Sequence, residues 1–154
     1  MSGPVTLESL DLAALLCSRV CHDLISPVGA VVNGIEVMED DKTRITWNLP
    51  RVLLPKNRVK LLLNLLLLAG GTIPRGGSLA LEPIGEGDTM GFKITSTGLN
   101  ARIAQAVPTL VAGEAENPID AHAIQPFYTG LLARACGMTV TLAPEGESIV
   151  LTAR

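Results

Sequence analysis

His22 is the residue whose type and position are best suited to chemistry. A neutral imidazole is a good nucleophile near pH 7, because its unperturbed pKa is about 6.5. Arg19 comes three residues before His22, and Asp23 follows it directly. In a helix Arg19 shares a face with His22, so its guanidinium can pair with an anionic group carried on the ring. Asp23 can accept a hydrogen bond from the imidazole and fix its tautomer.

The element that must position His22 is a long amphipathic helix, predicted from residue 7 to about residue 38. At roughly 100° per residue, one face carries a nearly unbroken apolar stripe, which needs a packing partner. The stripe consists of Leu10, Ala13, Leu16, Cys17, Val20, Leu24, Val28, Val31, Ile35 and Met38. The opposite face carries His22 with four candidate residues for partner docking, Leu15, Ser18, Ser26 and Gly29. Pro27 lies inside this helix and predicts a kink after His22.

Other interpretations of this segment are less specific. A lone helix histidine is usually a solvated surface residue, and Arg19 and Ser26 taken alone fit that description equally well. Cys17 and Cys21 invite a metal or haem interpretation, but their spacing is one residue too long for haem attachment. Both cysteines lie toward the apolar side, so we interpret them as core residues.

The segment from His22 to Pro27 resembles the H-box of sensor histidine kinases. In that motif the histidine is followed by an acidic residue, an aliphatic residue and a proline five places on, as in His22-Asp23-Leu24-Ile25-Ser26-Pro27. The resemblance implies that His22 accepts a phosphoryl group and faces solvent, where another active site can reach it.

Composition limits the class of protein. The formal net charge is −3, which argues against nucleic acid as the main partner. Three cysteines and the absence of a basic signal peptide favour a reducing, cytoplasmic setting. The longest apolar stretch, residues 59–69, includes Lys60 and Asn64 and is too short to span a bilayer. Aromatic residues make up only 3% of the chain, so aliphatic side chains must build the core.

The chain divides into two predicted regions: residues 1–42, a His-bearing helical segment for dimerisation and phosphotransfer, and residues 43–154, an α/β domain. The second region alternates strands and helices, which is typical of an α/β sandwich. Its predicted strands are residues 43–48, 78–83, 91–96, 138–143 and 148–153, the last two joined around Pro144-Glu145-Gly146. Its predicted helices run from about residue 55 to residue 69, from 101 to 112 with an interruption at Pro108, and from 123 to 135.

The order of these elements resembles the ATPase domain of histidine kinases, but the nucleotide-binding boxes are damaged. The stretch around Asn64 looks like the N-box, yet Leu67 and Leu68 stand where a second asparagine is expected. Residues 95–100 replace the Asp-x-Gly-x-Gly box and lack both the aspartate and the second glycine. Only Thr129-Gly130-Leu131 remains of the last glycine box. The sequence therefore predicts an ATPase-like fold that does not bind ATP, with Asn64 a structural remnant.

Taken together, these regions resemble the ChpT-type histidine phosphotransferases of bacterial phosphorelays. The similarity is closest in residues 12–30, 53–65 and 125–134. It implies an α+β fold, with a helical histidine-phosphotransfer segment followed by a degenerate ATPase-like domain, and a homodimer whose His-bearing helices form a four-helix bundle. It also implies phosphoryl transfer through His22 from the receiver domain of a hybrid histidine kinase to the receiver domains of response regulators. No cofactor is expected in the chain itself, because the receiver domain would bring the magnesium.

One departure from that family is large. The family has a second long helix, antiparallel to the first, but here Glu36 to Lys42 leads almost directly into the strand that contains Trp47. The second helix of the hairpin is therefore predicted to be absent, and the apolar stripe must be covered by the second domain or by another chain.

Two other functions stay open from the sequence. An ATP-dependent sensor histidine kinase core would need an intact Asp-x-Gly-x-Gly box. A non-catalytic module that docks response regulators would bind receivers equally well without His22.

Overall fold

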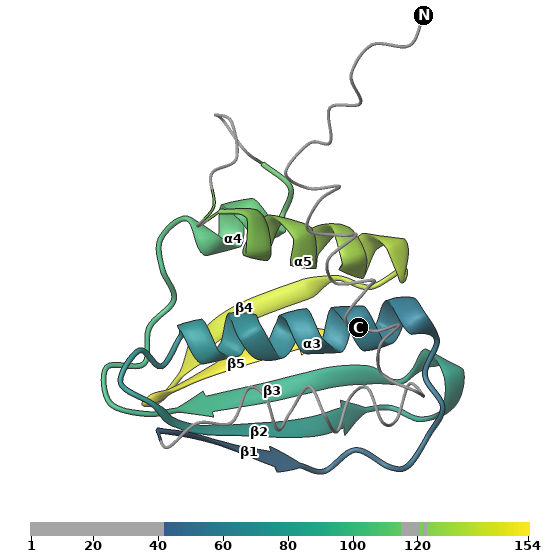
Figure 1. Cartoon of the computed structure of the whole chain (residues 1–154), viewed down its shortest axis with the longest axis horizontal. Helices are drawn as coiled ribbons and strands as arrows, with labels where there is room; N and C mark the ends of the chain where they lie inside the picture. The colour runs from purple at the N-terminus through teal and green to yellow at the C-terminus, as the bar shows by residue number, and fades with distance from the viewer. Residues whose placement is uncertain (1–41, 115–120, 122) are drawn as a thin grey trace, which may run out of the picture.

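The computed structural model describes residues 42–114, 121 and 123–154. Within them, a five-stranded mixed sheet carries three helices on one side (Figure 1). The strands are β1 (Thr43–Trp47), β2 (Gly77–Ile84), β3 (Gly91–Thr97), β4 (Val140–Glu145) and β5 (Ser148–Ala153). Their order is β1-β2-β3-β5-β4; β1 runs parallel to β2, and every other neighbouring pair is antiparallel.

The core lies between the sheet and the helices. Alternate residues of the central strands are buried on the helix side, as the period of two requires. The buried strand residues include Leu79, Leu81, Phe92, Ile94, Ile149 and Leu151. The residues between them, such as Lys93, Thr95 and Thr152, are less buried and lie on the other face. The predicted α+β class is confirmed, with an aliphatic core in which Phe92 is the one fully buried aromatic side chain of the described residues.

Helix α3 (Lys56–Gly71) lies across the middle of the sheet and contacts β2, β3 and β5. It is apolar on most of its circumference and buries eight side chains, because it packs against the sheet on one side and against α5 on another. Pro55 precedes its first residue, where a fixed φ and a missing N–H cost nothing. It ends at Gly70 and Gly71, as the sequence predicts.

Helix α4 is much shorter than the predicted helix of residues 101–112. It spans only Val107–Val111, and Pro108 lies at its start. The prediction treated Pro108 as an interruption inside a longer helix. A proline is compatible with the first turn of a helix, but it removes a hydrogen bond from the interior, so Pro108 lies in the first turn of a helix that begins one residue before it.

Helix α5 (Ile124–Ala135) packs on α3 and α4 and leads into the final hairpin. Gly137 follows it with φ of 68°, the left-handed conformation that commonly ends a helix. The hairpin turns at Gly146 and Glu147, since Glu145 pairs with Ser148. Pro144 is therefore part of β4, at the edge of the sheet, where a proline interrupts no ladder.

The described part of the chain contains no helix that combines the length and apolar character needed to cross a membrane. The division of the chain at residue 42 stays a prediction, because residues 1–41 lie outside the described ranges.

Candidate functional site

The predicted phosphoacceptor group lies outside the described residues. This holds for His22, Asp23 and Arg19 and for the predicted docking residues Leu15, Ser18, Ser26 and Gly29. What the structure describes is the domain that follows them, including every position of the three damaged nucleotide boxes. These positions lie on α3, on α5 and at the end of β3, and α3 contacts both of the other elements.

Asn64, the residue expected to be a remnant of the N-box, is buried in the middle of α3. Only 3% of it is exposed, and its Nδ2 donates a hydrogen bond to the carbonyl oxygen of Lys60 at 2.8 Å. This bond joins two residues of the same helix one turn apart. The amide nitrogen of Asn64 is thus directed back along α3 and not out of the domain.

Gln125, in the first turn of α5, occupies the space beside Asn64. Its Nε2 donates to the backbone oxygen of Asn64 at 2.8 Å and to Thr129 Oγ1 at 3.0 Å, and lies 3.4 Å from Asn64 Oδ1. Thr129 is fully buried, and its hydroxyl donates to the backbone oxygen of Gln125 at 2.7 Å. These bonds join α3 to α5 beside Asn64, the residue that resembles the N-box asparagine.

Ser96 stands on β3, two residues before Gly98, where the resemblance places the missing aspartate. It is fully buried, and its hydroxyl donates to the carbonyl oxygen of Ala69 at 3.2 Å. Thr72 Oγ1 donates to the same oxygen at 2.6 Å. Both hydroxyls therefore satisfy the last turn of α3, whose carbonyls have no partner within the helix.

The glycines that remain in the damaged boxes are required by close backbone packing. A Cβ added at Gly98 would lie 2.2 Å from the carbonyl oxygen of Gly76, and one at Gly130 would lie 2.0 Å from that of Val111. Real Cβ atoms do not approach an oxygen so closely. Each glycine thus has its open side filled by another backbone segment.

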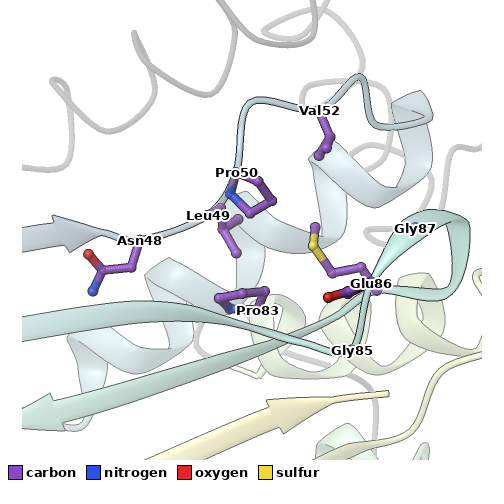
Figure 2. A pocket seen from close by; sticks show the side chains of 9 residues that line it. Asn48, Leu49, Pro50, Val52, Pro83, Gly85, Glu86 and Gly87 are labelled. Atoms are coloured by element: carbon purple, nitrogen blue, oxygen red, sulfur yellow. The ribbon is translucent and has the colours of Figure 1, made fainter.

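A separate pocket of about 580 Å³ lies between the segment that follows β1 and the turn between β2 and β3. In Figure 2, Leu49, Pro50 and Val52 lie on one side of it, and Pro83 and Glu86 lie on the other. Glu86 is its only charged lining residue, so the pocket does not suit phosphate groups. Sequence reasoning missed it, although the apolar, proline-containing run of residues 49–55 was a usable signal.

Cys136, at the end of α5, is the one cysteine within the described residues, and it is a free thiol. Burial raises the pKa of this thiol, and the nearby positive charge of Arg58 partly opposes the change. A raised pKa leaves less thiolate at neutral pH, so Cys136 is not an activated nucleophile. Within the described ranges no three His, Cys, Asp or Glu side chains are grouped so that they could hold a metal ion.

Comparison with known proteins relates this arrangement to one family. The family model described as the C-terminal domain of histidine phosphotransferases matches residues 31–148. The protein phosphotransferase ChpT of Brucella abortus (strain 2308) is 40% identical over 208 residues, which cover 99% of this chain and 100% of that protein. A solved 1.7 Å structure of a bacterial phosphotransferase is also 40% identical, with a TM-score of 0.71 and coverage of 99% and 100%.

A more distant likeness concerns the fold alone. The histidine kinase AdeS of Acinetobacter baumannii is 14% identical, with a TM-score of 0.54 over 98% of this chain and 86% of that structure. The α/β domain therefore has the architecture of a histidine kinase, as the order of its elements predicted.

The ChpT relative is also longer than this chain. The compared length of 208 residues exceeds the 154 residues here by 54, so that protein has at least this many residues without a counterpart. Because both chains are covered almost from end to end, the extra residues lie inside the sequence of the relative. Their number is sufficient for the second helix of a hairpin with its connections.

Proposed function

Because this chain belongs to the histidine phosphotransferase family, we propose that it carries a phosphoryl group on His22 from the receiver domain of a hybrid histidine kinase to the receiver domains of response regulators. The observation that carries the proposal is the match to that family over most of the chain, together with the His22-Asp23-x-x-x-Pro27 motif that precedes the matched domain. A phosphotransferase activity follows from the family; the residue and the partners are proposals.

The transfer requires two displacements at phosphorus. A ring nitrogen of His22 attacks the phosphoryl group of a phosphorylated receiver aspartate, the bond from phosphorus to the carboxylate oxygen breaks, and the aspartate leaves as a carboxylate. The aspartate of the next receiver then attacks the phosphohistidine, and the imidazole leaves. Arg19 would hold the phosphoryl oxygens, and Asp23 would orient the ring. Such a reaction depends mainly on positioning and charge stabilisation, and the receiver would supply the magnesium.

We further propose that the protein uses no ATP. Three observations support this: the side chain of Asn64 is bonded within α3 and beside Gln125, Ser96 replaces the adenine-binding aspartate, and Gly130 is packed against the backbone of α4. Each of these three features affects a different one of the three nucleotide-binding boxes. The alternative of an ATP-dependent sensor histidine kinase core would need all three parts restored.

The second alternative is a docking module that binds response regulators without carrying phosphate. It becomes attractive if the absent helix prevents His22 from reaching a receiver. The homodimer implied by the family likewise depends on how the apolar stripe is covered.

Labelling from a phosphorylated receiver tests the proposal. His22→Ala should abolish transfer of radiolabelled phosphate to this chain, because the attacking nitrogen is lost. The matched control is His122→Ala, which removes the only other histidine and should leave labelling unchanged. The label should be stable to alkali and labile to acid, as a phosphohistidine is and an acyl phosphate is not.

Labelling that persists in the His22→Ala variant would refute the role of His22. Receiver binding without any labelling of the wild-type chain would instead support the docking module. A receiver pull-down with both histidine variants separates these outcomes.

A further inference from the structure

Strand β4 forms one edge of the sheet, so one side of its backbone has no neighbouring strand among the described residues (Figure 1). The pair of residues just outside the ladder shows which side this is. The N–H of Thr139 donates to the carbonyl oxygen of Arg154 at 2.8 Å, and the N–H of Arg154 donates to that of Thr139 at 3.2 Å. Pairs with and without such bonds alternate along an antiparallel ladder. Thr141, Ala143 and Glu145 therefore bond to β5, and the backbone groups of the residues between them point away from it.

Val140 and Leu142 each present an N–H and a C=O at this open edge, whereas Pro144 presents a C=O alone. No backbone hydrogen bond from another described segment reaches these groups. Sheet edges are commonly protected by charged side chains, bulges or prolines, because an unprotected edge pairs with other strands. Residues 138–143 carry no charged side chain, and Pro144 protects only the end next to the turn. Residues 140–142 are thus a template for an added strand.

A groove of about 460 Å³ runs beside these residues, between β4 and the helices α4 and α5. Its lining comes from all three elements and includes Pro108, Val111, Ala133, Arg134, Val140 and Leu142. The side chains of Val140 and Leu142 therefore line the groove, on the helix side of the sheet, while their backbone groups face the open edge. A peptide paired antiparallel with them has every second side chain on the same side, next to the groove.

Arg134 is the one charged residue of this lining, and its side chain is exposed. Its Nη1 donates to the carbonyl oxygen of Val111 at 3.0 Å, which holds the guanidinium beside α4. Within the described part of the chain, no carboxylate forms an ion pair with it. A guanidinium has several N–H donors and binds carboxylates strongly, so those not used by Val111 are available to an acidic ligand. The charge of the groove thus favours an acidic peptide over a basic one.

We infer that β4 and this groove bind an extended acidic segment of another protein, which adds to the sheet as a further strand antiparallel to β4. Backbone bonds to Val140 and Leu142 supply the affinity, and the groove with Arg134 supplies the selectivity. The ligand carries Asp or Glu at positions that alternate with its outward side chains. The site includes none of the residues proposed for phosphotransfer, so its failure and that of the proposed function are distinguishable.

Fluorescence anisotropy of the full chain with a labelled peptide tests the site. The probe is fluorescein-Ser-Thr-Glu-Thr-Val-Thr-Glu-Ser-amide, which as a strand has Glu, Val and Glu on one face and Thr on the other. We expect saturable binding with a dissociation constant below about 1 mM. Replacing both Glu residues of the probe by Lys should weaken binding at least about tenfold, because the positive charges then face Arg134.

Methylation of backbone nitrogens tests whether the peptide binds as a strand. In an antiparallel pair the Glu and Val amides of the probe face β4, and the Thr amides face away. N-methylation of the Glu and Val residues should therefore weaken binding at least about tenfold, because it removes these donors. The matched control is N-methylation of the Thr residues, which should leave the affinity unchanged. Equal effects of the two patterns, or a loss with the Thr pattern alone, would overturn the inference.

Arg134→Gln should weaken binding of the original probe about tenfold, whereas Arg75→Gln, in the exposed turn before β2, should not change it. Hydrogen exchange of the wild type, followed by NMR, needs no substitution. The free amides of Val140 and Leu142 should exchange faster than those of Thr141 and Ala143, and saturating probe should slow them. Unchanged exchange with the probe would overturn the inference. Protection that rises with protein concentration in the absence of probe would also overturn it, and would assign the edge to a second copy of the chain.

Discussion

The amide of Gln125 holds two helices together through one nitrogen atom. It donates to the backbone oxygen of Asn64 on α3 and to the hydroxyl of Thr129 on its own helix. Both acceptors are on residues buried to 97% or more. A buried acceptor that loses its donor is left unsatisfied, which costs more than the bond itself contributed.

We therefore predict that Gln125→Ala lowers the free energy of unfolding by about 1–2 kcal/mol. Urea denaturation followed by circular dichroism measures this change. Gln105→Ala is the matched control, because Gln105 lies exposed before α4 and should change stability by less than about 0.5 kcal/mol. Equal effects of the two substitutions would show that the contact between α3 and α5 does not depend on Gln125.

The thiol of Cys136 permits a second prediction about a single residue. Burial raises the pKa of its thiol, so less thiolate is present at any pH near neutrality. Alkylation of Cys136 by iodoacetamide should therefore be slower than alkylation of a solvent-exposed cysteine with an ordinary pKa. The rate should rise with pH and reach half its maximum above the pKa of an ordinary thiol. A Cys17→Ser/Cys21→Ser variant isolates Cys136. The same variant unfolded in urea should react at the ordinary rate, and a folded protein that already reacts that fast would contradict the prediction.

Individual residues differed in how far the sequence could identify them. The role of His22 stays a prediction, drawn from a motif of six consecutive residues. Asn64 was interpreted as a structural remnant because leucines follow it where a second asparagine is expected, and this too stays a prediction. The role of Gln125 was not predictable, because it depends on the approach of α3 to α5 across 61 residues of chain. A side-chain contact of this kind leaves no periodic signal in the sequence.

Helices α4 and α5 meet so closely that only glycine fits at one point of their contact. A Cβ at position 130 would lie 2.0 Å from the carbonyl oxygen of Val111, the last residue of α4. The neighbouring Arg134 reinforces this contact, because its guanidinium donates to the same oxygen at 3.0 Å. The position of α4 therefore depends on the absence of a side chain in α5.

Gly130→Ala should destabilise the domain by about 2–4 kcal/mol, although alanine favours a helix by about 1 kcal/mol over glycine. The steric overlap with backbone outweighs the propensity. Gly70→Ala is the matched control: Gly70 is also helical, and nothing lies within 4 Å of its Cβ position. That variant should be neutral or stabilised by up to about 1 kcal/mol. Thermal unfolding of both variants, compared with the wild type, measures the difference.

At the level of elements, the sequence predicted every strand and helices α3 and α5 to within a few residues. These elements have strong periods or end at glycines, so local physics determines them. The helix predicted for residues 101–112 was wrong in extent, because α4 begins only at Val107 and Pro108 lies in its first turn. The first strand of the last hairpin was predicted to end at residue 143, two residues too early, since Pro144 and Glu145 both pair within β4. The pocket behind residues 49–52 arises from packing between segments that are distant in the chain, so the apolar run of residues 49–55 marked only one of its walls.

The molecule as a whole combines a kinase-like fold with the sequence of a phosphotransferase. Its domain matches a histidine kinase in architecture at 14% identity, whereas its 40% identical relatives are phosphotransferases. Architecture alone therefore does not distinguish nucleotide use from its absence. The contacts of Asn64, Ser96 and Gly130 support the proposal that this chain uses no ATP.

Nucleotide should consequently not change the stability of this protein. We predict that magnesium-ATP at up to 10 mM shifts the melting temperature by less than about 1 °C. A ligand present at one hundred times its dissociation constant would add about 2.7 kcal/mol and raise that temperature by several degrees. Magnesium alone is the control for ionic effects. A saturable increase specific to ATP would favour the sensor-kinase alternative.

The parallel pairing of β1 with β2 also affects the order in which the protein can assemble during synthesis. A growing chain leaves the ribosome from its N-terminus, so Thr43–Trp47 emerges before α3 and before Gly77–Ile84, its strand neighbour in the sheet. Two strands that are joined by a tight hairpin can form their hydrogen bonds soon after both have been synthesised. In contrast, β1 can pair only after α3 and β2 have also been made. The segment that bears His22 is thus made before β1, and the edge of the sheet to which it is attached can form only after about forty further residues have followed.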